Sequence, residues 1–194
     1  MDAAKCIGVM AENPGHIREY EGAESNFPQN GKCPLITLPT TAGSGAEIAG
    51  WAVITDTSRN YKMSLGSPYL TPDYALVDPV LALDLPPAQT AYSGFDALSQ
   101  AIEGMLSKRR TPISLALGMH AVKLISENLP VAMARGWDLE ARSNMSTGSL
   151  LSGIVIDISG CIAVHSLAET IDGMYHQPHG LCVALFLPHV MKFN

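Results

Sequence analysis

The sequence predicts a mixed fold, in which the later half of an α/β domain is followed by a helical domain. Apolar residues make up 47% of the 194-residue chain and charged residues only 15%, a balance typical of a compact protein with a sizeable core. Within residues 1–84, short strand-forming runs separated by turns follow an initial helix. From about residue 86 onward, apolar residues recur at helical spacing and no further strand is predicted.

The first part is expected to contain one helix and three short strands. The helix covers residues 1–11 and is broken by Asn13-Pro14-Gly15, and a polar loop follows over residues 25–32. The strand-forming runs are residues 35–38, 51–55 and 75–77. Because three short strands with long connections make only part of an α/β domain, we expect its first half to lie outside this chain.

The second part is expected to contain five helices. The first carries apolar side chains at helical spacing, namely Phe95, Leu98, Ile102, Met105 and Leu106. The others are predicted over residues 112–128, 138–156, 162–171 and from 178 onward. Pro130 and Gly173 are expected to stop the second and fourth helices, and Pro188 to kink or end the fifth. Asp138 is the expected N-cap of the third.

Net charge and cysteine content limit the classes of binding partner and the cellular compartment that we expect. The formal net charge is −6 and no basic run exceeds Lys108-Arg109-Arg110, so we expect neither nucleic acid nor an anionic membrane as a partner. No apolar run reaches the length of a membrane span, and the first residues lack the pattern of a signal peptide. The four cysteines show no paired spacing and are expected to be buried free thiols, which fits a cytoplasmic protein.

The segment Thr40-Thr41-Ala42-Gly43-Ser44-Gly45 follows a predicted strand and is rich in small residues and hydroxyl groups. Glycines let a ligand approach the backbone, and Thr and Ser hydroxyls can hydrogen-bond a ribose or a phosphate. On this pattern alone an ordinary tight loop is the favoured interpretation, and a nucleotide site is the alternative.

A second group of polar residues lies on the predicted helices. Asp96 and Gln100 share a helix face by their i, i+4 spacing. His165 and Glu169 do the same on a later helix, and His179 stands at the start of another. Metal sites in helical bundles are built from carboxylates and imidazoles that project from separate helices. Taken singly, each histidine is better explained as a hydrogen-bonded core residue and Asp96 as an N-cap.

Taken together, these segments resemble the iron-containing, or group III, alcohol dehydrogenase family. The segments that carry the resemblance are Met1-Asp2-Ala3-Ala4-Lys5, Pro39 to Glu47, Asp78-Pro79, residues 90–98, Glu103, residues 163–168, residues 175–180, residues 187–191 and Phe193-Asn194. Pro39 to Glu47 is similar to the family's P-T-T-A-G-T-G-S-E signature. The resemblance covers the whole chain but only about the middle half of a typical member, so we expect a chain truncated at both ends.

The resemblance implies a division into two domains with a cleft between them. Residues 1–84 would be the second half of a dinucleotide-binding domain and residues 85–194 a helical metal-binding domain, in an architecture similar to that of dehydroquinate synthase. The cleft would hold NAD or NADP and a divalent metal. By position, the residues expected to line the cofactor are Asp2, Thr40, Thr41, Ser44 and Lys62. Without the resemblance, Lys62 would be interpreted as a solvated surface lysine.

The family holds its metal with one Asp and three His, and Asp96, His165 and His179 match three of these ligands. The fourth is replaced, because the family pattern D-A-L-x-H ends here in Gln100. Gln100 can still offer its amide oxygen and is the expected fourth ligand, although an amide oxygen is a weaker ligand than imidazole for iron or zinc. We therefore expect a weak, altered or empty site, with iron as the first expectation and zinc as the second. Glu169 replaces a further family histidine and would relay a proton or supply a carboxylate ligand.

The implied function is metal-dependent hydride transfer between a nicotinamide cofactor and a small alcohol or aldehyde, with Glu169 in the catalytic role. We expect a homodimer, and a chain that is nearly inactive alone because the phosphate loop would precede Met1. The alternative is a truncated or metal-site-degenerate homologue without catalysis of its own, kept for binding or assembly. A purely structural helical module would not explain the hydroxyl-rich turn.

Overall fold

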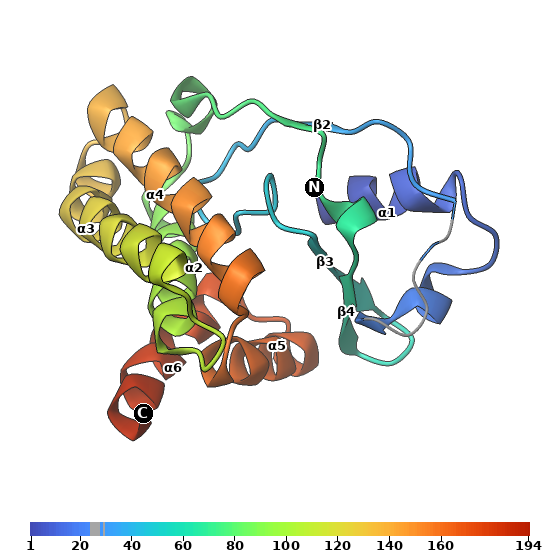
Figure 1. Ribbon diagram of the computed structural model, residues 1–194. Helices are drawn as coiled ribbons and strands as arrows, with labels where there is room; N and C mark the ends of the chain where they lie inside the picture. Colours follow the sequence, from blue (N-terminus) through green and yellow to red (C-terminus); the bar gives the residue numbers. More distant parts are fainter. Residues whose placement is uncertain (24–27, 29) are drawn as a thin grey trace.

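The computed structural model describes residues 1–23, 28 and 30–194, and its elements fall into two parts (Figure 1). The first part contains α1 (Asp2–Met10), η1 (Ile17–Tyr20), β1 (Gly22–Ala23), β2 (Ile36–Thr37), β3 (Trp51–Asp56), β4 (Tyr61–Gly66), η2 (Pro68–Leu70), β5 (Tyr74–Ala75) and η3 (Pro79–Ala82). The second contains α2 (Pro87–Leu106), α3 (Pro112–Ala134), α4 (Leu139–Ser159), α5 (Ala163–Tyr175) and α6 (His179–Phe193). Strands before residue 86 and helices after it are confirmed, while the domain boundary at residue 84 stays a prediction. Residues 25–27 and 29 of the predicted polar loop lie outside the described residues.

The strands form two small sheets. One has the order β1-β4-β3, with β1 parallel to β4 and β4 antiparallel to β3, and the other pairs β2 with β5 in parallel. Strand β4 was missed by the sequence prediction. The alternation of buried Met63 and Leu65 with the more polar Lys62 and Ser64 was the signal that could have found it. Asn60, with a φ of 47°, makes the turn that returns the chain from β3 to β4.

Several helices continue past their predicted ends. Helix α3 runs through Pro130, and α5 runs past Gly173 to end where His176 adopts a left-handed conformation, so these two predictions were wrong. Helix α6 does not end at Pro188. The loss of one backbone hydrogen bond at a proline is offset where the flanking turns pack in a bundle. The Asp138 cap is confirmed by a 3.0 Å hydrogen bond from the Ala141 amide. Among the described residues, no single helix is both long enough and apolar enough to cross a membrane. Helices α4 and α5 reach that length and apolarity only when taken together, and the pair is bent by 104°.

Each part has its own apolar core, and the hydroxyl-rich turn lies where they join. Helices α2, α3 and α4 bury one cluster, α5 and α6 bury a second, and α1 with the β3–β4 hairpin buries a third. Gly45, with a φ of 62°, lies so close to α4 that a Cβ on it would come within 2.4 Å of the Gly153 Cα. The Gly50 amide also donates a 2.8 Å hydrogen bond to Asp157 of α4. These contacts fix the turn against the helical part.

The four cysteines are free, but only two of them are buried as predicted. Cys6 and Cys182 are buried, Cys33 is half-buried and Cys161 is exposed. Burial raises the pKa of the Cys6 thiol to about 11. The expectation of buried residues was wrong for Cys33 and Cys161 because each lies in a connection just outside a regular element, although the Cys161 sulfur itself is turned away from water.

Candidate functional site

Two cavities adjoin where the two parts of the molecule meet. One has a volume of ≈ 570 Å³ and is lined by Met1, Asp2, Ala3, Leu38, Pro39, Thr40, Thr41, Ser44 and Ala46. The other has a volume of ≈ 550 Å³ and extends from β3 and β4 to α2, α5 and α6. Asp2, Ser44 and Ala46 line both cavities. A single extended ligand can therefore lie along both.

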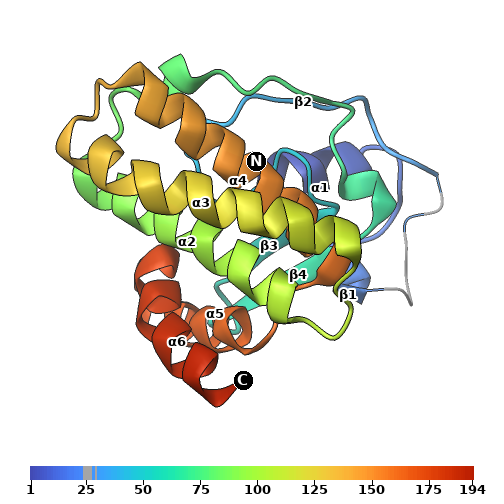
Figure 2. The same cartoon turned by 60° about the vertical axis from the view of Figure 1, so that its left-hand side comes forward.

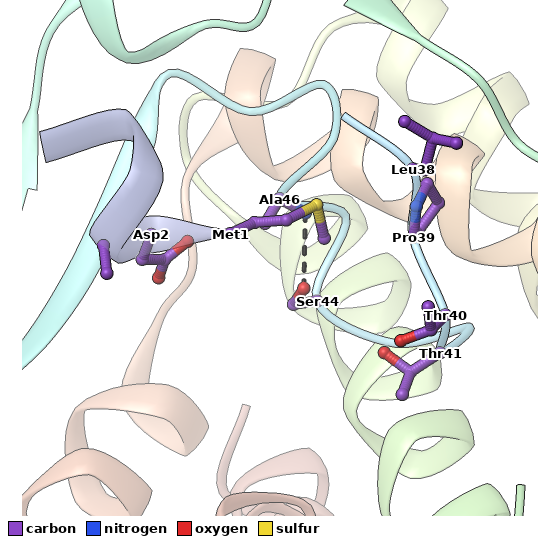
Figure 3. Close-up of a pocket in the computed structure, with 9 residues that line it drawn as sticks. Met1, Asp2, Leu38, Pro39, Thr40, Thr41, Ser44 and Ala46 are labelled. Carbon is purple, nitrogen blue, oxygen red and sulfur yellow. Dashed lines mark hydrogen bonds between the residues drawn. The ribbon is translucent and has the colours of Figure 1, made fainter. Parts of the chain in front are cut away.

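The first cavity gathers the hydroxyl groups predicted to face a cofactor. Figure 3 shows the Asp2 carboxylate on one side, Thr40 and Thr41 on the other and Ser44 between them. The Asp2 carboxylate accepts a 2.9 Å hydrogen bond from the Val53 amide, which ties the start of α1 to β3. Thr40, Thr41 and Ser44 are exposed, so their hydroxyls are accessible to a ribose or a phosphate.

The second cavity contains a cluster of three groups that suit a divalent metal. Asp96 of α2, His165 of α5 and His179 of α6 place their ligand atoms within 4.8 Å of one another. The Asp96 Oδ1 lies 3.2 Å from the His165 Nε2 and 3.7 Å from the His179 Nε2. Asp96 lies in the middle of α2 and is not an N-cap. Two imidazole nitrogens and a carboxylate oxygen converging from three helices fit a transition metal.

His165 is held from behind by Glu103, which is 1% exposed. The Glu103 carboxylate makes a short hydrogen bond with the His165 Nδ1 and accepts hydrogen bonds from the amides of Ile162 at 3.0 Å and Val164 at 2.8 Å. Burial opposes protonation of His165, but the hydrogen bonds to Asp96, Cys161 and Glu103 raise its pKa well above the ordinary value. A carboxylate on Nδ1 leaves Nε2 to face a metal.

His179 has an equivalent support that reaches across to the other part of the molecule. Its Nδ1 lies 2.5 Å from the Asp172 Oδ2, and the same oxygen accepts a hydrogen bond from the Lys62 ammonium at 2.9 Å. The Asp172 side chain is 1% exposed, and Lys62 comes from β4. Lys62 lines the cavity and is ion-paired, so it is not the free surface lysine that its position in the sequence would suggest.

Gln100 also reaches the cluster, but with its amide nitrogen. Its Nε2 donates to the Ser44 carbonyl at 3.2 Å and to the Asp96 Oδ1 at 3.3 Å. Its Oε1 faces α4, where the Ser152 hydroxyl lies at 3.1 Å. The expectation that residue 100 offers its carbonyl oxygen to the cluster is not met in this arrangement.

Glu169 lines the same cavity as the cluster and is half-buried. Burial raises the pKa of its carboxyl group, while the nearby His165, His179 and Lys62 pull that pKa down. A carboxyl group with a raised pKa next to a reacting centre is suited to proton transfer.

A comparison of the sequence with protein-family models identifies the family. Residues 1–79 match the model described as iron-containing alcohol dehydrogenase, and residues 90–194 match the C-terminal model of the Fe-containing alcohol dehydrogenase family. The chain belongs to the iron-containing alcohol dehydrogenase family. The resemblance identified in the sequence is thereby confirmed.

Similar proteins within this family include an NAD-dependent methanol dehydrogenase of Bacillus methanolicus, which is 40% identical over all of this chain and 50% of its own length. The structure of a 1,3-propanediol oxidoreductase superposes with a TM-score of 0.94 at 36% identity and covers 100% of this chain and 50% of its own. A sulfoacetaldehyde reductase of Bifidobacterium kashiwanohense, solved in complex with NAD+, gives a TM-score of 0.92 at 34% identity over 100% and 51%. The chain spans about half the length of the curated relatives it matches, and the predicted fold class is confirmed.

Two residues that support the cluster in this member of the iron-containing alcohol dehydrogenase family were missed by the sequence prediction. Glu103 carried part of the family resemblance without a role of its own, and no role was predicted for Asp172. Each lies seven residues, two helical turns, after a residue of the cluster on the same helix, Glu103 after Asp96 on α2 and Asp172 after His165 on α5. The Cys161 sulfur lies within 4.8 Å of the ligand atoms of Glu103 and His165, and burial of this sulfur raises the thiol pKa although the residue itself is exposed.

Proposed function

We propose that the protein is a metal-dependent oxidoreductase that transfers a hydride between a nicotinamide cofactor and a small alcohol or aldehyde. The observation that carries this proposal is the junction of the two cavities at Asp2 and Ser44. Hydroxyl groups for a nucleotide lie at one end, and the cluster of Asp96 and the two histidines lies at the other. The names of the methanol dehydrogenase and of the NAD+-bound reductase agree with this chemistry.

In this proposal Asp2, Thr40, Thr41 and Ser44 would hold the cofactor, and Lys62 would lie near its nicotinamide ribose. The first cavity offers hydroxyls and a carboxylate, which suit the ribose hydroxyls of NAD or NADP. Lys62 lines the second cavity and donates a hydrogen bond to Asp172, so one side chain would contact both the cofactor end and the support of His179.

A divalent metal, iron first and zinc second, fits the donors of Asp96, His165 and His179 and would supply a Lewis acid that lowers the pKa of an alcohol hydroxyl. Glu103 and Asp172 bind the Nδ1 atoms and orient the Nε2 atoms toward the cleft. Glu169 accepts the hydroxyl proton of the alcohol, because it lines the same cavity as the cluster. The assembly we propose is a homodimer in the cytoplasm.

Metal binding and thermal stability test the proposal together. A ligand that binds only the folded state at 100 times its Kd stabilises that state by about 2.7 kcal/mol. We expect iron, zinc or manganese to raise the melting midpoint of the wild type and a chelator to reverse the rise. The His179→Ala variant, which removes one donor, should show a smaller rise. Elemental analysis without metal, together with an unmoved melting curve, would refute the proposed metal role.

A further inference from the structure

We infer that Gln100 is a positioning residue, and that among the described residues the cation is held by Asp96, His165 and His179 without it. This inference rests on the proposed metal function and deepens it. In the family pattern the corresponding residue is a histidine that would ligate through a ring nitrogen. Here the side chain reaches the same place, 3.3 Å from the Asp96 Oδ1, but presents an N–H group to it.

The orientation of the Gln100 amide is set by two neighbours that can only accept hydrogen bonds. The backbone carbonyl of Ser44 lies 3.2 Å from the Nε2, and the Asp96 carboxylate lies 3.3 Å from the same atom. Rotating the amide by half a turn would place its oxygen against both of these oxygens and lose both hydrogen bonds. Gln100 is only 4% exposed, so water would not replace the lost donors. The amide oxygen therefore stays on the side of Ser152 and α4.

The same contacts give Gln100 a structural role next to the cluster. One N–H group of the Gln100 amide fixes the Asp96 carboxylate, whose Oδ1 lies next to the Nε2 atoms of His165 and His179. The other fixes the Ser44 carbonyl in the turn that lines both cavities. Gln100 therefore links the position of a metal ligand to the position of the nucleotide-facing turn. A cation held by one carboxylate and two imidazoles keeps coordination positions open for water or substrate oxygen.

Titration of cobalt(II), followed by its visible absorption, separates a ligand from a positioning residue. The band positions and intensities report the number and type of donor atoms, and the titration midpoint reports affinity. We expect Gln100→Leu to leave the bands of the wild type unchanged and to weaken affinity about tenfold, as loss of an outer hydrogen bond to a ligand does. His179→Ala is the matched control that removes a true donor, and it should change both the bands and the affinity.

Gln100→Ala is the second variant, because truncation introduces no group that could clash, and circular dichroism checks that each variant is folded. Bands that shift in Gln100→Leu and Gln100→Ala as they do in His179→Ala would overturn the inference and leave the proposed metal function standing. A wild-type chain that binds no cobalt would overturn both. Unchanged bands with a weakened midpoint support Gln100 as a positioning residue.

Discussion

The two histidines of the cluster have the same support but different surroundings. Each binds a buried carboxylate through Nδ1 and faces Asp96 through Nε2. Glu103, behind His165, is fixed by two backbone amides within the helical part. Asp172, behind His179, is fixed by the Lys62 ammonium, which belongs to the β3–β4 hairpin of the other part. The His165 side chain is 10% exposed and that of His179 is 28% exposed.

The cluster therefore has two halves. His165 with Glu103 is a preformed half, held within the helical part alone. His179 with Asp172 is a dependent half, because its support needs Lys62 of the other part. His165 keeps its orientation as long as α2 and α5 stay packed. His179 keeps its orientation only while the hairpin lies against α5 with Lys62 in place. A movement of the two parts relative to each other would therefore change the cluster on the side of His179 first.

The largest effect on the preformed half is expected for Glu103→Gln. The new amide can still accept from the two backbone amides, but it then presents an N–H group to the His165 Nδ1. The imidazole must accept at Nδ1 and carry its proton on Nε2, where the metal would bind. We expect affinity for zinc to fall by about 10- to 100-fold, measured by calorimetry. An unchanged affinity would show that the tautomer of His165 is not set by Glu103.

Gln100→His should move affinity in the opposite direction. The side chain at residue 100 already reaches the Asp96 Oδ1, and an imidazole there would offer a ring lone pair in place of an N–H group. We expect affinity for iron and zinc to rise at least about tenfold, or about 1.4 kcal/mol. The new imidazole would have no buried carboxylate on its other ring nitrogen, unlike His165 and His179. The gain in affinity therefore measures the contribution of a ring nitrogen alone. A flat or weaker constant would show that Glu169 or crowding already controls this position.

Lys62→Met tests the dependent half. Removing the ammonium leaves Asp172 in place but frees it from the hairpin, so we expect zinc affinity to fall by roughly threefold to tenfold, less than for Glu103→Gln. Lys62→Arg, which keeps the charge, is the matched control and should lose less. If Lys62→Met costs as much as Glu103→Gln, the two halves depend equally on their supports and the comparison fails.

Asp56→Asn should have the smallest effect, and only on the strand-bearing part, where Asp56 also pairs with Arg18 of η1. Hydrogen bonds from the Ser58 hydroxyl and the Arg59 guanidinium hold the pKa of Asp56 well below its usual range. A lowered folded-state pKa stabilises the protein above the unfolded pKa of about 3.9, and this contribution is lost as pH falls toward the folded value. We expect the wild type to melt above Asp56→Asn at pH 7 and the gap to close below about pH 4. A gap that widens in acid would contradict this assignment.

The sequence predicted much of the fold because the local signals were strong. Helical periodicity located five helices, and Asp138 located a cap. The ends at Pro130 and Gly173 were misplaced because packing in the bundle outweighs local breakers. The grouping of Asp96, His165 and His179 was predicted through the family resemblance. The amide orientation of Gln100 could not be predicted, since it depends on the Ser44 carbonyl, which is brought close only by the tertiary fold.

The contact between Gly45 and Gly153 limits which relatives can be joined with this protein to make a chimeric protein that folds. Each glycine occupies the space that a side chain on the other would need, because a Cβ on Gly153 would come within 2.8 Å of the Gly45 Cα. The two positions lie on opposite sides of any crossover made between residues 80 and 90. A chimera that joins the strand-bearing segment of one relative to the helices of another therefore inherits one member of the pair from each parent. Only parents that both bring glycine should give a hybrid whose turn seats on α4.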